Sequence, residues 1–425
     1  MFKYLIENSP KLHGNISISG SKNSSLPILA ACLLTDEFIQ LSNCPHVSDI
    51  LLTLNMLNQI GVNVSFSQYE NGELLINLQS HQNVKTVCSY DFVKQMRASI
   101  LMLGPMLAKF GEAEISLPGG CAIGVRPVDR HIKALEKMGA VIKIKNGYLN
   151  AHVSNGKLKG TDITFDDITV GGTENVLMAA CLAEGETIIH NAAIEPEIIH
   201  LIDFLIAMGA KITGKGTHKI TIQGVKSLNG IKYSIPTDRI QAYTYAIISA
   251  ATGFGITLSN TSKNDFTGTE NVLEQIGIGL EQIGDKLHIK QIKDDLYSAN
   301  FTTAPMPGFP TDCQAQTMAL LTVVNGVSIV SEGIFENRMM HVAELLRMGA
   351  DIKLNGHTAI VTGIKNLNGA EVMATDLRAS ASLVIAGLIA KGKTTINRIY
   401  HIERGYDFLP TKLEICGAKI KKIRE

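Results

Sequence analysis

One cysteine lies in a glycine-rich segment, LPGGCAIGVRPVD, which runs from Leu117 to Asp129. Glycines stand on both sides of Cys121, and Arg126 follows five residues later. Glycine allows such a loop to move, and a neighbouring guanidinium group favours the reactive thiolate form of a cysteine. Two interpretations follow: Cys121 is an incidental small residue in a loop, or its thiol takes part in the chemistry.

Arginine is used sparingly, since only ten of the 39 basic residues are arginine. Six of the ten lie in glycine-, polar- or turn-rich phrases. Any one of them, considered singly, is more often a surface or ion-paired residue. Six in similar settings instead predict a shared anionic ligand, because the planar guanidinium group binds phosphate or carboxylate at two points. These residues are Arg97, Arg126, Arg239, Arg338, Arg378 and Arg404.

Two further segments place polar or charged side chains just before a buried helix. Lys22 and Asn23 stand in ISGSKNSSLPIL, where a lysine near a helix N-terminus is either part of an anion site or a solvated loop residue. Asp312 stands in PGFPTDCQAQ, after a proline-rich turn. Its carboxylate either caps the helix or acts as a general base or hydroxyl-positioning group.

Sequence patterns for metals and common cofactors are missing. The chain has no His-Glu-x-x-His motif, no clustered His and Cys, no Gly-x-Ser-x-Gly motif and no dinucleotide fingerprint. We therefore expect chemistry without a metal or cofactor, on an anionic substrate.

A repeat of about seventy residues organises the chain. Six phrases of the type LEKMGAVI recur, and their glycines are 68 to 78 residues apart. Such regularity indicates a repeated structural unit. The six glycines are Gly61, Gly139, Gly209, Gly277, Gly349 and Gly417.

Each phrase predicts a helix followed by a strand. Apolar residues recur at helical spacing up to Gly139, which is placed to end the helix in the left-handed conformation. Ile142 and Ile144 then alternate with lysines, as in a half-buried strand. Asn146-Gly147 follows, and this pair favours a tight hairpin.

A second set of phrases, such as LMAACLAEGETII and LVIAGLIAKGKTTI, predicts helices that are apolar all round. Such helices must be buried on every side. Helices laid against short, partly antiparallel sheets indicate an α+β fold. Since 425 residues exceed one ordinary core, we expect two domains, each built from three units.

Composition excludes several classes of protein. Lys+Arg equals Asp+Glu at 39 each and Trp is absent, so neither nucleic acid nor an anionic membrane is an expected partner. The longest apolar runs, Leu26–Leu34 and Ala381–Ala390, are too short to span a membrane. The N-terminus lacks a signal-peptide pattern, and the seven scattered cysteines argue against a disulfide framework. We expect a cytoplasmic protein, and its oligomeric state stays open.

Several phrases together closely resemble the UDP-N-acetylglucosamine enolpyruvyl transferase family of the EPSP synthase superfamily. They occur in order along essentially the whole chain, and the cysteine loop is highly specific to that family. The phrases are SGSKNSSLPIL, QMRASILMLGP, PGGCAIGVRPVD, FPTDCQAQ, FENRMMHVAEL, TDLRASASLVIAG and HIERGYD.

The resemblance implies a two-domain inside-out α/β barrel with six β-α-β-α-β-β repeats, three per domain. It places residues 22–236 in one domain, with residues 1–21 and 237–425 in the other. The active site is expected in the cleft between the domains.

The resemblance also implies the reaction. The family transfers the enolpyruvyl group of phosphoenolpyruvate to the 3-hydroxyl of UDP-N-acetylglucosamine and releases phosphate, by addition and elimination through a tetrahedral ketal. This is the first committed step of peptidoglycan synthesis and the target of fosfomycin. The alternatives are the sister enzyme that acts on shikimate 3-phosphate, in which we do not expect this cysteine loop, and a non-catalytic repeat scaffold.

Residue roles are carried over by the same resemblance. Cys121 is the general acid, and Asp312 takes or orients the proton of the sugar hydroxyl. Lys22, Arg126 and Arg404 hold the phosphate of phosphoenolpyruvate, and Lys22 and Arg404 are also counted as catalytic. The remaining phosphoenolpyruvate contacts are Asn23, and Arg338 and Arg378 toward the carboxylate.

The nucleotide sugar is expected to meet a larger set of residues. Two positions depart from some family members, which carry lysine where this chain has Ser48 and Asp167. Diphosphate contacts at these positions are expected to use backbone amides or another cation. The expected contacts are Arg97, Arg126, Pro127, Val128, Asp129, Arg130, Asp167, Ile168, Thr169, Val170, Asp312 and Ile334.

Overall fold

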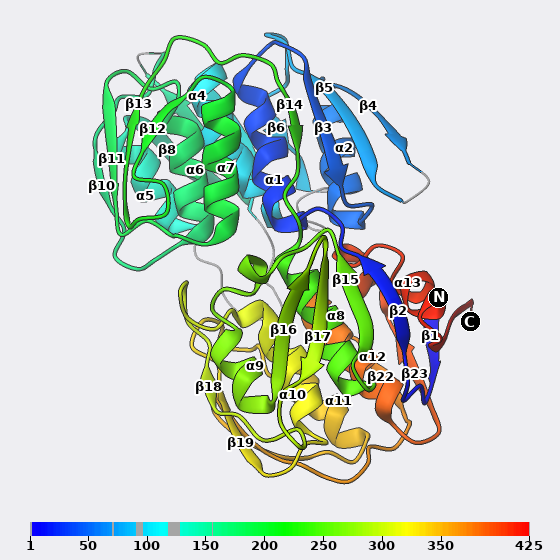
Figure 1. Ribbon diagram of the computed structural model, residues 1–425. Coiled ribbons are helices and arrows are strands. Elements are labelled where there is room, and N and C mark those ends of the chain that lie inside the picture. The colour runs from blue at the N-terminus through cyan, green and yellow to red at the C-terminus, as the bar shows by residue number, and fades with distance from the viewer. Residues whose placement is uncertain (1, 70–71, 91–96, 118–127, 155, 425) are drawn as a thin grey trace. The chain divides into compact units, whose positions relative to one another are not determined.

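The computed structural model describes residues 2–69, 72–90, 97–117, 128–154 and 156–424 (Figure 1). The chain divides into two compact units. The terminal unit contains both ends of the chain, from residue 2 to residue 19 and from residue 237 to residue 424. The inserted unit lies between them in sequence, from residue 20 to residue 236.

One repeat of the inserted unit shows the building plan. Its sheet has the order β10-β11-β13-β12. β10 and β11 are parallel and are joined through a helix, whereas β12 and β13 form an antiparallel hairpin that pairs with β11. This is the predicted β-α-β-α-β-β unit. Its elements are β10 (Asp162–Thr164), α6 (Val170–Ala180), β11 (Glu186–His190), α7 (Pro196–Ala207), β12 (Lys211–Thr213) and β13 (Lys219–Gln223).

The other two sheets of the inserted unit repeat this order, as β6-β7-β9-β8 and β14-β3-β5-β4. The first uses β6 (Val87–Cys88), η2 (Arg97–Met102), α4 (Leu103–Phe110), β7 (Glu112–Ser116), α5 (Asp129–Lys137), β8 (Ala140–Lys145) and β9 (Tyr148–Val153). The second uses α1 (Lys22–Ala31), η1 (Cys32–Leu34), β3 (Ile39–Cys44), α2 (Ser48–Gln59), β4 (Asn63–Gln68), β5 (Leu74–Gln79) and β14 (Lys232–Ser234).

The terminal unit also has three such sheets among its described residues, and two of them recruit strands from the start of the chain. The first has β2 (His13–Ser17), α8 (Arg239–Ala251), β15 (Gly255–Ser259), η3 (Lys263–Phe266), α9 (Glu270–Ile276), β16 (Ile278–Ile283) and β17 (Lys286–Gln291). The second has β18 (Phe301–Thr302), η4 (Thr311–Cys313), α10 (Gln314–Leu321), β19 (Val327–Ser331), α11 (His341–Arg347), β20 (Asp351–Asn355) and β21 (Thr358–Thr362). The third has β22 (Glu371–Met373), α12 (Leu377–Ile389), β23 (Lys393–Asn397), η5 (Ile399–Arg404), α13 (Leu409–Ile415), β24 (Lys419–Arg424) and β1 (Phe2–Glu7).

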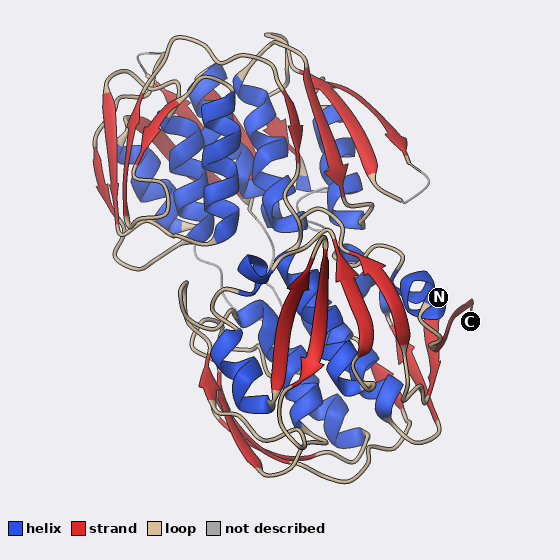
Figure 2. Cartoon of the chain, viewed as in Figure 1, coloured by secondary structure: helices blue, strands red, loops and turns tan. Residues whose placement is uncertain are grey.

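The inner helices are the ones predicted to be apolar all round, and this prediction is confirmed. Every residue of α10 is buried, as are residues 172–180 of α6, 240–250 of α8 and 378–388 of α12. Figure 2 shows the helices of each unit in the middle, with strands outside them. Helix α10 packs against both α8 and α12.

The six repeat glycines confirm the predicted helix ends. Their φ angles lie between +88° and +107°, a region in which a side chain is strained. The predicted hairpin at Asn146-Gly147 is also confirmed, with φ of +53° and +80° between β8 and β9. The prediction that Ile144 is on the buried face of its strand is wrong. Its side chain is 61% exposed, because β8 is an edge strand of its sheet.

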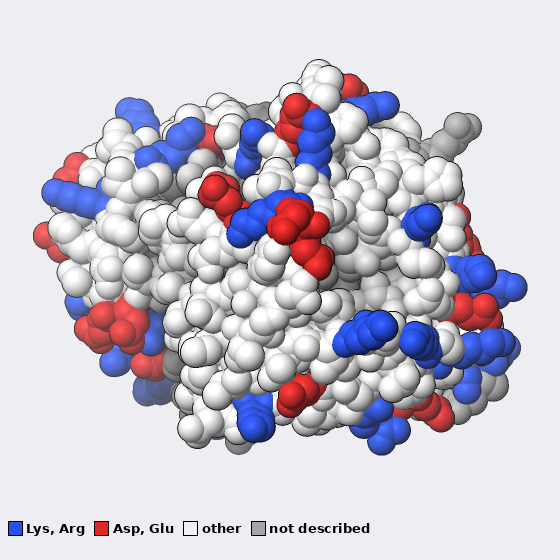
Figure 3. Space-filling model, turned by 60° about the horizontal axis from the view of Figure 1, so that its bottom comes forward, with Lys and Arg blue, Asp and Glu red and all other residues white. Residues whose placement is uncertain are grey.

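The surface agrees with the balanced charge of the sequence. Figure 3 shows basic and acidic residues interspersed on one face, between large uncharged areas. Across the described residues, the structure contains no helix that could cross a membrane and no group of His, Cys, Asp and Glu suited to a metal ion.

Candidate active site

Asp312 is held by two arginines in the terminal unit. It lies in η4, and its Oδ1 is 2.6 Å from an Nη atom of Arg338, while its Oδ2 is 2.8 Å from an Nη atom of Arg378. The two arginine side chains are only 6% and 4% exposed, whereas that of Asp312 is 25% exposed. Two guanidinium groups therefore converge on one carboxylate that still reaches solvent. Such charge-assisted bonds are strong and directional.

The helix-cap interpretation of Asp312 does not hold. The residue that caps η4 is Pro310, and the residue that caps α10 is Cys313. The backbone carbonyl of Asp312 accepts a hydrogen bond of 2.8 Å from Gln316. The Asp312 side chain is thus committed to the arginines and not to the helix that follows.

Arg378 is fixed by the start of helix α12. The carboxylate of Asp376 caps this helix and accepts the backbone N–H of Arg378 at 2.9 Å. The guanidinium group also donates to the hydroxyl of Tyr406 at 3.1 Å. Burial works against its positive charge, but Asp312, Tyr406 and Asp238 together raise the pKa of Arg378 above its ordinary value. Arg378 is therefore charged whenever the protein is folded.

Arg338 rests on a second carboxylate through a threonine. It donates to the hydroxyl of Thr311 at 3.0 Å, and that hydroxyl donates to Glu332 at 2.9 Å. Glu332 also accepts the backbone N–H of Ile334 at 2.9 Å, which places the predicted sugar-contacting residue in the same network. The Nε–H of Arg338 is buried and has no acceptor among the residues that the structure describes. An additional acceptor group is needed to satisfy it.

Arg404 lies two residues before Tyr406. It is the last residue of η5 and is half-buried. The hydroxyl of Tyr406 bonds both Arg378 and Thr244, the latter at 2.8 Å. The structure thus links the predicted phosphate ligand Arg404 to the arginine–carboxylate cluster through the short segment of chain between them.

Lys22 is the first residue of helix α1 in the inserted unit. Ser21 caps this helix by accepting the backbone N–H of Ser24 at 3.1 Å. The Nζ atom of Lys22 is 3.4 Å from Oδ2 of Asp49, and the two side chains are 11% and 3% exposed. Asn23 beside it is half-buried. A lysine at a helix N-terminus combines two sources of positive potential, which suits a phosphate group.

The two expected nucleotide segments meet in the inserted unit. Arg130 and Asp167 form an ion pair of 2.6 Å, with side chains 31% and 71% exposed. Asp129 begins helix α5, close to Val128, and Thr169 caps helix α6 at Val170, just after Ile168. The acidic departure at Asp167 therefore engages a neighbouring cation from the same predicted nucleotide site. The other departure, Ser48, begins helix α2.

Some expected residues lie outside the described part. Cys121, Arg126 and Pro127 fall in the undescribed segment 118–127, and the side chain of Arg97 is likewise not described. The six described cysteines are all buried. Burial raises the pKa of Cys88, Cys181 and Cys313 to about 12, which makes these thiols poor nucleophiles.

Four contributors to these clusters were not singled out from the sequence: Asp49, Thr311, Glu332 and Tyr406. Tyr406 lies in the HIERGYD phrase and Thr311 in FPTDCQAQ, so both belong to motifs in which other residues were expected to act. Asp49 and Glu332 lie in no motif that would single them out.

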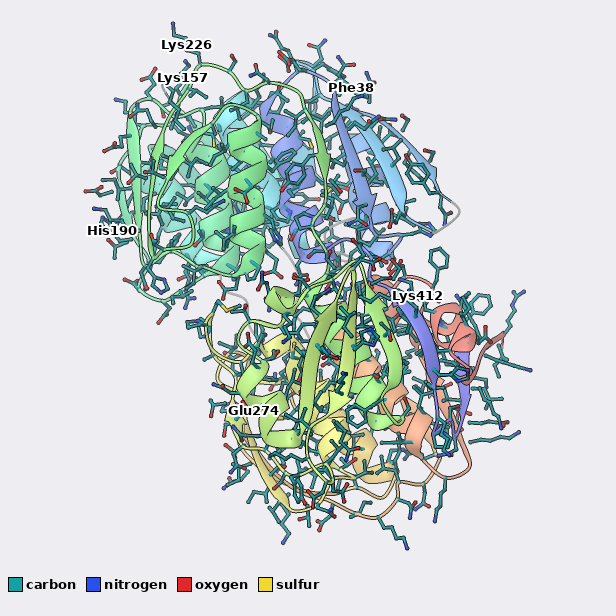
Figure 4. The ribbon with its side chains drawn as sticks, in the orientation of Figure 1. Phe38, Lys157, His190, Lys226, Glu274 and Lys412 are labelled. Atoms are coloured by element: carbon teal, nitrogen blue, oxygen red, sulfur yellow. The ribbon has the colours of Figure 1, made fainter. Side chains whose placement is uncertain are left out.

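A cavity of about 490 Å³ in the inserted unit includes none of the expected site residues; Lys157 and Lys226 on its lining are labelled in Figure 4.

Comparisons with known proteins agree with the fold and the sequence motifs. Residues 6–413 match the family of EPSP synthase (3-phosphoshikimate 1-carboxyvinyltransferase). The chain is 48% identical over 429 residues to a UDP-N-acetylglucosamine 1-carboxyvinyltransferase of Paramagnetospirillum magneticum, with 100% of this chain and 99% of the relative covered. It is 46% identical over 424 residues to the protein of the same name from Xylella fastidiosa, with 100% of both covered.

Solved structures confirm the expected fold. The enolpyruvyl transferase NikO from Streptomyces tendae matches with a TM-score of 0.89 at 20% identity, over 99% of each chain. An EPSP synthase from Acinetobacter baumannii matches with a TM-score of 0.74 at 21% identity, over 100% of both chains. The two-domain repeat architecture is therefore that of the enolpyruvyl transferases.

Proposed function

The chain belongs to the EPSP synthase family and is an enolpyruvyl transferase, and we propose the residues with which it transfers the enolpyruvyl group of phosphoenolpyruvate to UDP-N-acetylglucosamine. The choice of acceptor follows the two full-length relatives, which are 46% and 48% identical. We place the reaction in the cytoplasm, at the first committed step of peptidoglycan synthesis. The observation that carries the residue assignment is the pair of buried arginines on Asp312.

Phosphoenolpyruvate has a carboxylate and a phosphate close together, so its binding needs several cations in a small volume. Arg338 and Arg378 bind the carboxylate of phosphoenolpyruvate with the same guanidinium groups that hold Asp312. The Nε–H of Arg338 supports this role, because it is buried and has no acceptor among the residues that the structure describes. Lys22, Asn23, Arg126 and Arg404 bind the phosphate end.

The addition step joins the two substrates. The thiol of Cys121 gives its proton to the methylene carbon of phosphoenolpyruvate, and the sugar 3-oxygen bonds to the neighbouring carbon. Asp312 accepts the proton of the 3-hydroxyl, so one proton enters and one leaves. The product of this step is a tetrahedral ketal that keeps the phosphate.

The elimination step restores the double bond. The bond from carbon to the phosphate oxygen breaks and phosphate leaves toward Lys22 and Arg404, taking the proton that Asp312 accepted. The Cys121 thiolate takes one proton back from the methyl group. The nucleotide end is held meanwhile by Arg97, Arg126 to Arg130, Asp167 to Val170 and Ile334. No metal or cofactor takes part in this scheme.

A coupled assay of phosphate release tests the proposal. Phosphoenolpyruvate is supplied with UDP-N-acetylglucosamine, with shikimate 3-phosphate, or with neither. We expect release only with the nucleotide sugar. Release only with shikimate 3-phosphate would assign the sister activity, and no release with either acceptor would favour a non-catalytic scaffold.

A further inference from the structure

A buried carboxylate adjoins the segment that carries Arg404. Asp407 is 3% exposed and accepts the hydroxyl of Ser19 at 2.6 Å. The Nζ atom of Lys412 lies 3.2 Å from both of its oxygens, and the amide of Gln241 donates to it at 3.1 Å. Lys412, from helix α13, is labelled in Figure 4. The carboxylate is therefore fully engaged although it is almost inaccessible.

The charge of this group is maintained in the folded protein. Burial acts to raise the pKa of Asp407, but the ammonium group of Lys412 and the hydrogen bonds from Ser19, Lys412 and Gln241 outweigh it. The net effect is a pKa below the ordinary value. An ionised, paired carboxylate is thus part of the native structure.

One of these donors, Gln241, fixes the chain on both sides of Tyr406. The Nε2 of Gln241 donates to the backbone carbonyl of Gly405 at 3.2 Å as well as to Asp407. The residue between them, Tyr406, directs its hydroxyl to Arg378 at 3.1 Å. Since Arg378 holds Asp312, a continuous set of contacts runs from Asp407 to the candidate general base.

Asp407 also lies where the chain leaves and re-enters the terminal unit. Ser19 is the last residue of the first segment of that unit. Its backbone carbonyl accepts the N–H of Asp238 at 2.9 Å, near the start of the returning segment. Through Ser19, the Asp407 carboxylate therefore ties the segment that carries Arg404 to the residues at which the chain leaves and re-enters the terminal unit.

We propose that Asp407 is a positioning residue for phosphoenolpyruvate: its charge, held between Lys412, Ser19 and Gln241, orients the Arg404–Tyr406 segment and, through Tyr406, the guanidinium group of Arg378. This inference rests on the proposed function, because it assigns Arg404 and Arg378 to that substrate. The simpler alternative is a buried ion pair that only stabilises the fold. The two accounts differ in what a neutral variant does to substrate affinity.

The test compares Asp407→Asn with the wild type in steady-state kinetics. Asparagine keeps the shape of the side chain and removes its charge. We expect KM for phosphoenolpyruvate to rise about tenfold or more, with KM for UDP-N-acetylglucosamine within about twofold. Asp407→Glu should recover most of the loss because it restores the charge. A purely structural role would leave the ratio of the two KM values unchanged.

The matched control is Asp265→Asn in the same unit. Asp265 is an acid that bonds Thr261 and Ser262 in a capping box, away from the proposed site residues in sequence. It should lower the melting temperature without changing either KM. If Asp265→Asn and Asp407→Asn change the KM ratio equally, the positioning role is overturned.

Gln241→Leu covers the case in which Asp407→Asn does not fold. The Oε1 of Gln241 is already buried without a donor among the described residues, so leucine removes mainly the two bonds to Asp407 and Gly405. We expect KM for phosphoenolpyruvate to rise about threefold, as it should rise for Asp407→Asn. An unchanged KM would overturn the inference.

Calorimetry separates this inference from the proposed function. Turnover of the wild type with UDP-N-acetylglucosamine tests the function, whereas calorimetric binding of phosphoenolpyruvate needs no turnover. Weaker binding to Asp407→Asn than to the wild type supports the positioning role even if the acceptor is misassigned. Equal binding overturns it while the function stands.

Discussion

Arg378 and Asp312 are 66 residues apart in sequence and form an ion pair of 2.8 Å. The pair connects the first turn of helix α12 to the short turn that precedes helix α10. The arginine is almost fully buried and the carboxylate is one-quarter exposed. A buried cation held by an acid that reaches solvent can share its positive charge with an incoming anion.

Asp312→Asn should abolish most of the turnover while the protein stays folded. Asparagine still offers an oxygen to Arg338 or Arg378 but cannot accept a proton. Loss of a general base lowers kcat by about 10²-fold or more. Steady-state phosphate release measures the effect, and circular dichroism checks the fold. A folded variant with wild-type kcat would remove Asp312 from the mechanism.

Arg378→Lys should weaken phosphoenolpyruvate binding in particular. Lysine keeps the charge but cannot bond Asp312, Tyr406 and a substrate carboxylate through one planar group. We expect KM for phosphoenolpyruvate to rise by about tenfold to a hundredfold, with a small change for the nucleotide sugar. The control is Arg347→Lys, an arginine 59% exposed that bonds Glu344 and the carbonyl of Glu371. Equal effects of the two variants would refute the assignment.

Thiol labelling should be confined to Cys121. Burial raises the pKa values of the other cysteines, so at neutral pH they are protonated as well as inaccessible. Mass spectrometry of the folded protein after fosfomycin treatment should find one adduct, formed faster with UDP-N-acetylglucosamine present. Cys121→Ser should give none. An adduct on Cys313, next to Asp312, would show that Cys121 is not the only reactive thiol and would contradict its assignment as the general acid.

Asp167→Lys should strengthen nucleotide binding. Asp167 neutralises Arg130 at 2.6 Å, and the substitution both releases that arginine and adds a cation. We expect KM for UDP-N-acetylglucosamine to fall about threefold, with little change in stability because exposed pairs contribute at most about 1 kcal/mol. Asp203→Lys, at an exposed 2.7 Å pair with Lys215, is the control. A rise in KM would show that the Asp167 carboxylate, and not only its backbone, helps to hold the nucleotide.

Stability should fall below neutral pH partly because of His131. Burial lowers the pKa of His131 from 6.5 to about 4, and its Nδ1 accepts the amide of Asn175 at 2.7 Å. The unfolded chain binds the proton more readily, so the contribution is complete above pH 6.5 and is lost as the pH falls toward 4. Between pH 7.5 and 5 this is about 2 kcal/mol.

The measurement is urea unfolding of the wild type and of His131→Gln at both pH values. The glutamine variant should be less stable at pH 7.5 but should lose less stability on acidification. His341 in the terminal unit, whose pKa burial also lowers to about 4, should keep its own contribution in both proteins. Parallel loss in the two proteins would show that His131 does not carry the effect.

The sequence determined the local structure and the reaction class. Gly139 and its five equivalents end helices because glycine adopts their φ angles of +88° to +107° without strain, and the all-apolar phrases form the buried helices. Both signals are local, so they can be read without knowing where the chain goes next. Ile144 was misjudged because alternation alone does not show that β8 lies at the edge of its sheet.

Only the tertiary structure decided which side chains meet. Strand β2 pairs with β15, and β14 with β3, across more than 180 residues of sequence in each case. The same long-range folding brings Arg338 and Arg378 to Asp312, and Ser19 to Asp407. Contacts of this kind depend on burial and on the convergence of separate repeats. Neither can be recognised from the residues next to each partner in the sequence. The motifs therefore identified the charged groups, and the packing of the repeats determined which of them share a bond.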